Sequence, residues 1–257
     1  MTDVRSAIYV YGVVLASDRT VMASEGVGRE KTRVRRITHD GIAALVSDLP
    51  ASALAAARDL RAHWSVLEEA AARTTVLPVR FGTVMESEEA VVDEFLAPNA
   101  ERLAAVLAEL DGKVQLSVKG FYDEERLLRQ VVKETPEIAR LRERVQTLPE
   151  AATYYARIQL GELVAAEVDR HRARDADLVL GRLEPLAVAA KAESPTTEDA
   201  ALNTAFLVRR DGVDAFSDAV QRLVGELGDR VRIRYVGPLP PYSFADDEAT
   251  LASGAWA

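Results

Sequence analysis

The chain has 257 residues, of which 48% are hydrophobic and 28% charged, and its formal net charge is −9. These values are typical of a soluble globular protein with one large or two small cores, and the negative charge argues against a nucleic-acid-binding surface. Because the sequence has no cysteine, disulfides, thiolate catalysis and cysteine-ligated metals are excluded. No apolar run approaches the ~20 residues of a membrane span, so we expect a cytoplasmic protein without membrane contact.

The chain opens with an apolar segment at residues 7–15, which predicts a buried first strand. Residues 33–38 and 42–48 form a hairpin turned by His39-Asp40-Gly41, because Asp-Gly tolerates positive φ. Residues 52–74 form a helix. Its predicted core stripe consists of Leu54, Ala57, Leu60, Trp64, Leu67 and Ala71.

The segment Leu-Pro-Val-Arg-Phe-Gly-Thr follows this helix and predicts a short strand at residues 76–81. Pro78 has no backbone N–H, so the strand must lie at a sheet edge or carry a bulge. Gly82 ends it. We expect Phe81 to be buried and Arg80, in so apolar a segment, to pair with a carboxylate of the fold.

Residues 87–110 are predicted to be helical with a break at Pro98. Further elements follow in order: a strand at 114–122, helices at 124–134, 136–148 and 149–176, a loop at 193–198, a strand at 203–209, a helix at 213–227 and a last strand at 230–236. This order predicts an α+β fold with helices on one sheet face. The turn signal Asp111-Gly112 divides two apolar patterns.

We therefore expect two α+β domains, residues 1–111 and 112–245, followed by a flexible tail at 246–257. Each domain is expected to hold a small, mostly antiparallel sheet packed with helices, the second one ferredoxin-like. The sequence shows no residue pattern typical of a catalytic site. None of the three histidines has a partner at metal-ligand spacing, and the chain lacks a dinucleotide fingerprint, a phosphate-binding loop and a nucleophile elbow. We predict no catalytic, cofactor-binding or metal-binding residue, and hence no enzyme.

One polar pattern stands out in the last strand. Arg230, Arg232 and Arg234 alternate with apolar residues, so they share one face of the strand. Two interpretations remain open. The arginines pair with acidic neighbours in the sheet, or they form a docking surface for an acidic partner, to which guanidinium groups are suited.

The segment Gly-Pro-Leu-Pro-Pro-Tyr-Ser-Phe at residues 237–244 follows this strand. Its prolines stiffen an extended chain, which lowers the entropic cost of placing Tyr242 and Phe244 on a surface. We expect these rings to pack back onto the protein, because an exposed apolar segment promotes association.

The two proline-containing segments together resemble the gas vesicle protein F/L family. The positions that carry the resemblance are Pro78, Arg80, Phe81, Gly82, Pro241, Tyr242 and Phe244. The opening Tyr9-Val10-Tyr11-Gly12-Val13, His63 and the strand at 110–119 agree with it, so it covers residues 7–244. At Gln115-Leu116 the chain departs from the glutamate and aromatic residue typical of the family, which weakens any role for a carboxylate there.

The resemblance implies an accessory or assembly protein of gas vesicles, which are gas-filled shells built in the cytoplasm from a small hydrophobic protein. It implies the shell protein and other accessory proteins as partners, support of nucleation or assembly as the role, and no cofactor. The alternative is a small-molecule-sensing regulatory α+β protein, and a third interpretation is a hydrolase with scattered catalytic residues.

Overall fold

The computed structural model describes residues 7–17, 22–28, 30–49, 57–194, 200–228 and 231–249. The chain forms two compact units. The first comprises Met1–Leu116, Leu207–Arg210 and Gly237–Ala257, and the second comprises Ser117–Phe206 and Asp211–Val236. The cut at residues 111–112 stays a prediction. The observed units place a break five residues later and return the chain to the first unit after Val236.

The first unit contains a sheet with the strand order β2-β3-β1-β4, in which β5 also pairs with β1. Its strands are β1 (Ala7–Leu15), β2 (Arg35–His39), β3 (Ile42–Leu49), β4 (Leu77–Pro78) and β5 (Val84–Met85). The β2–β3 hairpin is confirmed, with positive φ at Asp40 and Gly41. Pro78 lies at the sheet edge, as predicted, opposite Gly12 of β1.

A bulge in β1 determines which side chains face which core. Its pairing with β3 shifts between Val10 and Gly12, so one extra residue reverses the alternation. Gly12 is needed at this point because a Cβ would lie 2.7 Å from the carbonyl oxygen of Leu77. The tight approach of β4 to β1 therefore depends on a residue without a side chain.

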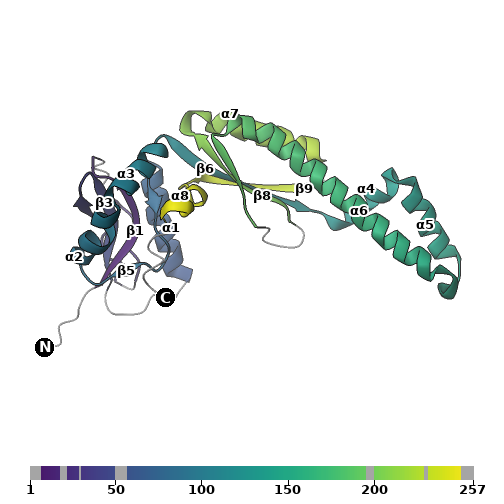
Figure 1. Ribbon diagram of the computed structural model, residues 1–257, viewed down its shortest axis with the longest axis horizontal. Coiled ribbons are helices and arrows are strands. Elements are labelled where there is room, and N and C mark those ends of the chain that lie inside the picture. The colour runs from purple at the N-terminus through teal and green to yellow at the C-terminus, as the bar shows by residue number, and fades with distance from the viewer. Residues whose placement is uncertain are drawn as a thin grey trace. The chain divides into compact units, whose positions relative to one another are not determined.

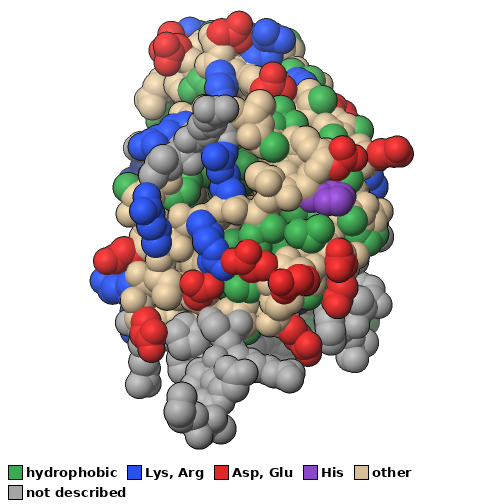
Figure 2. Space-filling model, turned by 90° about the vertical axis from the view of Figure 1, so that its left-hand side faces the viewer, with side chains coloured by type: hydrophobic (Ala, Val, Ile, Leu, Met, Phe, Trp, Pro, Cys, Tyr) green, Lys and Arg blue, Asp and Glu red, His purple; other side chains and the backbone are tan. Residues whose placement is uncertain are grey.

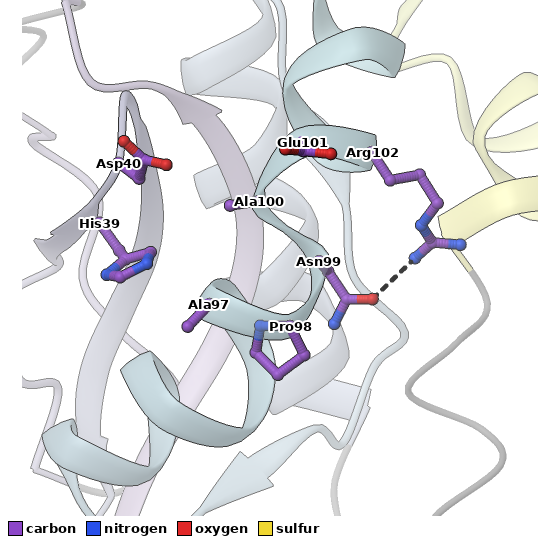
Figure 3. A pocket seen from close by; sticks show the side chains of 8 residues that line it. All are labelled: His39, Asp40, Ala97, Pro98, Asn99, Ala100, Glu101 and Arg102. Atoms are coloured by element: carbon purple, nitrogen blue, oxygen red, sulfur yellow. Dashed lines mark hydrogen bonds between the residues drawn. The ribbon is translucent and has the colours of Figure 1, made fainter.

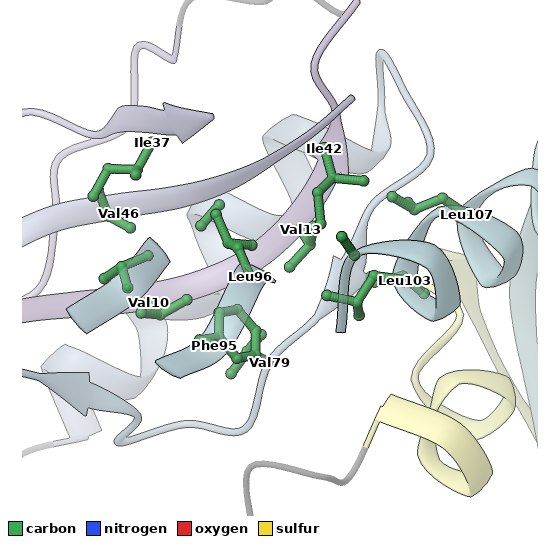
Figure 4. Packing of buried hydrophobic residues seen from close by; sticks show 14 of the residues in the cluster. Val10, Val13, Ile37, Ile42, Val46, Val79, Phe95, Leu96, Leu103 and Leu107 are labelled. Atoms are coloured by element: carbon green, nitrogen blue, oxygen red, sulfur yellow. The ribbon is translucent and has the colours of Figure 1, made fainter. Parts of the chain in front are cut away.

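Helices cover both faces of this sheet, so the prediction of helices on one face is wrong for the first unit. On one face, Val10, Ile42 and Val46 pack with residues of α3 (Ala100–Glu109) and of the irregular helical segment before it (Figure 4). That segment runs from α2 (Glu88–Ala90) through a π-helical turn (Val91–Leu96) and a 3₁₀ turn (Ala97–Asn99), so the predicted break near Pro98 is confirmed. On the other face, Tyr9, Tyr11 and Leu45 pack against α1 (Ala57–Ala71).

The predicted core stripe of α1 has to be corrected. Leu60 is 41% exposed, and Ala57 is exposed as well. The buried side instead includes the polar residues Asp59 and His63 beside Val66 and Leu67. A pattern built only on apolar residues shifts the stripe, because buried polar side chains are not counted in it. Leu54 lies outside the described residues.

The second sheet has the strand order β7-β8-β6-β9. Along the chain its elements are β6 (Lys113–Tyr122), α4 (Glu124–Glu134), α5 (Pro136–Thr147), α6 (Glu150–Leu183), β7 (Ala189–Ala192), β8 (Ala200–Arg209), α7 (Val213–Leu227) and β9 (Val231–Leu239). Along the chain the order is strand, helices, two strands, helix and strand. Together with the spatial order of the strands, this defines a ferredoxin-like topology, as expected (Figure 1).

The core of the second unit lies between its sheet and its helices. Phe206 of β8 packs on Phe216 of α7 with ring centroids 5.2 Å apart. The ring of Tyr235, from β9, also stacks on Phe216. The 34-residue helix α6 packs against α4, α5 and α7. Among the residues that the structure describes, no helix combines the length and apolarity of a membrane span.

Candidate functional site

The structure contains an open depression in the first unit, lined by His39 and Asp40 of the β2–β3 turn and by residues 97–102 (Figure 3). The Asn99 side chain is already engaged. It donates to the Phe95 carbonyl at 2.8 Å and accepts a hydrogen bond from Arg102 at 3.3 Å. Asp40 and Glu101 lie on different elements, and no nucleophile–base pair is among these lining residues.

The histidines and carboxylates do not gather into a metal site in the described parts of the chain. In the second unit, His171 of α6 lies 3.3 Å from a Glu134 carboxylate oxygen, and Tyr122 donates to Asp175 at 3.1 Å. These contacts attach the end of α4 and the end of β6 to the long helix. The charged stretch 170–177 thus serves packing through its buried members.

The Pro-Val-Arg-Phe-Gly segment does not continue as a strand beyond Pro78, and two expectations about it were wrong. Phe81 is 37% exposed. Arg80 is exposed, and no carboxylate in the described ranges forms an ion pair with it. The physical reason is that the chain turns here: the N–H of Thr83 bonds the Arg80 carbonyl at 3.3 Å, with φ of +93° at Gly82. We call residues 79–83 the motif turn.

Buried polar groups under the motif turn form a network that sequence reasoning missed. Tyr9 and His63 are 0% and 1% exposed. The Tyr9 hydroxyl lies 3.0 Å from His63 Nδ1 and accepts a hydrogen bond from the Gly82 N–H at 3.0 Å. His63 also bonds to the backbone of Val79, and burial lowers its pKa to about 4. The signals present in the sequence were a tyrosine in an apolar strand and a histidine before the motif.

Neighbouring rings extend this network into an aromatic cluster. Tyr11 lies 4.8 Å from Tyr9 and 5.7 Å from His63, and Phe81 lies 5.6 Å from His63, as centroid distances. The Tyr11 hydroxyl bonds the Ser47 hydroxyl at 2.8 Å and accepts from the Val27 N–H at 2.7 Å. Burial raises the pKa of both tyrosines. Both tyrosines are therefore held neutral, and their hydroxyls are hydrogen-bonded within the first unit.

The C-terminal motif packs onto the first unit. After the buried Pro241, α8 (Tyr242–Ala249) begins, a helix that the sequence did not predict. The Tyr242 ring lies 4.6 Å from that of Trp64, Phe244 packs on the α3 side of the sheet, and the Ser243 N–H donates to the Gln115 side chain at 2.9 Å. Gln115, where the chain departs from the family pattern, thus holds the start of α8.

The arginine stripe is described only in part, since Arg230 lies outside the described residues. Arg232 and Arg234 are exposed on β9, an edge strand. The Arg232 guanidinium lies 5.6 Å from the Phe121 ring centroid, a cation–π arrangement. A role of these arginines in partner binding stays a prediction.

Exposed apolar side chains gather where α5 and α6 meet. Tyr155 is 84% exposed, Tyr154 63%, Ile158 45% and Leu148 43%, and the two tyrosine rings contact edge to face at 5.4 Å. We call these four residues the hairpin surface. On the face of the molecule drawn in Figure 2, hydrophobic side chains likewise lie in patches between acidic and basic ones. Such surfaces characterise proteins that bind other proteins.

The fold defines an α+β protein whose second unit carries exposed apolar side chains. The family model described as gas vesicle synthesis protein GvpL/GvpF matches residues 7–246. The chain belongs to this family, and it therefore has a role related to gas vesicles.

Similar proteins agree over nearly full lengths. The chain is 38% identical to gas vesicle protein F of Streptomyces sp. (strain CB03234), over 93% of this chain and 99% of that protein. The crystal structure of GvpF from Anabaena sp. PCC7120 has a TM-score of 0.81 and 29% identity, covering 93% and 98% of the two chains. That of GvpF from Microcystis aeruginosa has a TM-score of 0.74 and 28% identity, with the same coverage.

Proposed function

We propose that this chain is a gas vesicle accessory protein that binds the small hydrophobic shell protein and supports nucleation or assembly of the vesicle. Other gas vesicle accessory proteins are further proposed partners, with Arg232 and Arg234 as candidate contacts. The family relationship supports a role in gas vesicle assembly. The hairpin surface carries the proposal that the shell protein is bound.

The hairpin surface suits a hydrophobic client. A shell subunit exposes apolar surface before it is assembled, and such surface aggregates unless it is covered. Tyr154 and Tyr155 offer large, rather rigid apolar faces with a polar tip. Aromatic residues of this kind dominate the binding energy of many interfaces. Holding subunits in this way would keep them available for growth of the shell.

We expect a variant with Tyr154→Gln, Tyr155→Gln and Ile158→Gln to bind the shell protein roughly 100-fold more weakly, the loss of about 3 kcal/mol from several anchors. Glutamine keeps good helix propensity, so the unfolding temperature should not change. The measurement is a titration of detergent-free shell protein against both forms. Val224→Gln removes another exposed apolar residue, 41% exposed on α7, and should bind like the wild type. Equal binding by the triple variant would refute the role of the hairpin surface.

A further inference from the structure

The strand β9 forms one edge of the second sheet. In the described parts of the chain the strand order β7-β8-β6-β9 ends at this strand, which is nine residues long. An edge strand presents backbone N–H and C=O groups that pair readily with another extended chain. The side chains along the edge therefore determine which extended chains it accepts.

Side chains of β9 alternate between the two faces of the sheet. Tyr235 stacks on Phe216 of α7, so the tyrosine marks the face that the helix covers. Arg232 and Arg234 lie on the opposite face, and both are exposed. The Arg232 guanidinium lies over the Phe121 ring, which shows that the arginine face continues from β9 onto β6.

Two contacts define how β9 pairs with β6. Arg232 lies over Phe121, and Gly237 approaches Leu116 so closely that a Cβ there would lie 2.6 Å from the leucine side chain. From the first contact to the second, the numbering rises along β9 and falls by the same amount along β6. The strands are therefore antiparallel, and the residue two positions after Arg232 lies beside the residue two positions before Phe121.

These two neighbours are Arg234 and Lys119, so three cations, with Arg232, share one face of two adjacent strands. In the described ranges none of the three forms an ion pair, although the chain has a net charge of −9. Like charges on neighbouring strands destabilise a sheet. This repulsion distinguishes the place from a single unpaired arginine elsewhere on the surface, and an anionic neighbour would relieve it.

The same charges indicate which chain fits the edge. A second copy of β9 would bring its own arginines close to Arg232 and Arg234, which is unfavourable. The opposite edge of the sheet, β7, contributes Lys191 and no carboxylate, so that strand of a second copy offers no opposite charge. An extended segment with an acidic residue at every second position would place carboxylates beside both arginines.

We propose that β9 binds an acidic, extended segment of a partner protein by strand addition, with the carboxylates of that segment on Arg232, Arg234 and Lys119. Backbone hydrogen bonds along the edge supply affinity, and the alternating charges fix the register and exclude other strands. This deepens the contact proposed above between the two arginines and other accessory proteins. It rests on the proposed function for the identity of the partner as an accessory protein, and the mode of binding stands apart from it.

The test is a titration of the full-length protein with a synthetic peptide in which glutamate alternates with threonine, followed by amide hydrogen exchange. We expect saturable binding and slower exchange at alternate amides of β9, because a strand pairs with each neighbour through every second residue. The same peptide methylated at every backbone nitrogen cannot donate hydrogen bonds to the edge and should not bind. Added salt should weaken binding, since exposed ion pairs are screened.

The double variant Arg232→Glu with Arg234→Glu should bind the glutamate peptide at least about tenfold more weakly, the usual effect of losing charge-assisted contacts. It should instead bind a peptide in which lysine alternates with threonine, which the wild type should not. The control, Arg140→Glu with Arg222→Glu, makes the same change of net charge at exposed positions of α5 and α7 and should bind like the wild type.

Reversal of the peptide preference in the double variant, with an unchanged unfolding temperature, supports the proposal. No saturable binding of the glutamate peptide, equal binding by the double variant, or undiminished binding of the methylated peptide overturns it. Tighter binding of a single-stranded oligonucleotide than of the glutamate peptide also overturns it. These results leave shell-protein binding by the hairpin surface in place, and a failure of that binding overturns the proposed function without affecting strand addition at β9.

Discussion

A chain that ends at Val236 should unfold at a temperature about 10 °C lower than the full-length protein, a loss of roughly 4 kcal/mol. The segment removed contributes Tyr242 against Trp64, Phe244 against the α3 side of the core, and the buried Ala245. It also bonds Gln115 through the Ser243 N–H. All of these contacts lie within the first unit, so its core would be opened to water.

Two controls separate the packing of α8 from chain length and from polar effects. A chain that ends at Ala249 keeps these contacts and should unfold like the full-length protein. Tyr242→Phe should be as stable as the wild type or more stable, because the buried Tyr242 hydroxyl has no hydrogen-bond partner within the described residues. Tyr242→Ala should be destabilised by about 2 kcal/mol, since the ring is only half buried. An unchanged unfolding temperature of the Val236 truncation would contradict this account.

Between pH 6.5 and pH 4 the protein should lose roughly 3 kcal/mol of stability through His63 alone. Burial lowers the pKa of His63 from 6.5 to about 4 in the folded state, and each pKa unit corresponds to about 1.4 kcal/mol. In this window the unfolded chain binds the proton and the folded chain does not, so stability rises with pH. The contribution is complete above pH 6.5 and is lost as the pH falls to 4.

The contact of His63 with the Val79 backbone favours the protonated form, but burial outweighs it, so the net shift of the His63 pKa is downward. The measurement is the free energy of unfolding by urea at a series of pH values, for the wild type and for His63→Gln. The difference between the two curves should change by roughly 3 kcal/mol across the window. Parallel curves would mean that His63 is not held neutral.

The order and type of most elements could be predicted from local sequence. β1, α4 and α7 have the predicted bounds, because their apolar periodicity and end signals are contained within each segment. The β2–β3 hairpin follows from Asp-Gly chemistry. Elements whose stability comes from distant contacts were missed. The short edge strand β7 is largely exposed and has little apolar pattern, and α8 follows two prolines that indicated an extended chain.

The candidate sites divide in the same way. The absence of cysteine follows from the composition, and the family was indicated by two sequence motifs. Both observations depend only on which residues are present and in what order. Whether Phe81 is buried and which groups support the motif turn depended on Tyr9 and His63, which are 54 positions apart in the chain. A polar side chain can be buried only where a partner from another segment bonds to it. Tertiary structure alone brings those partners together, and it alone determined which surfaces are left exposed for binding.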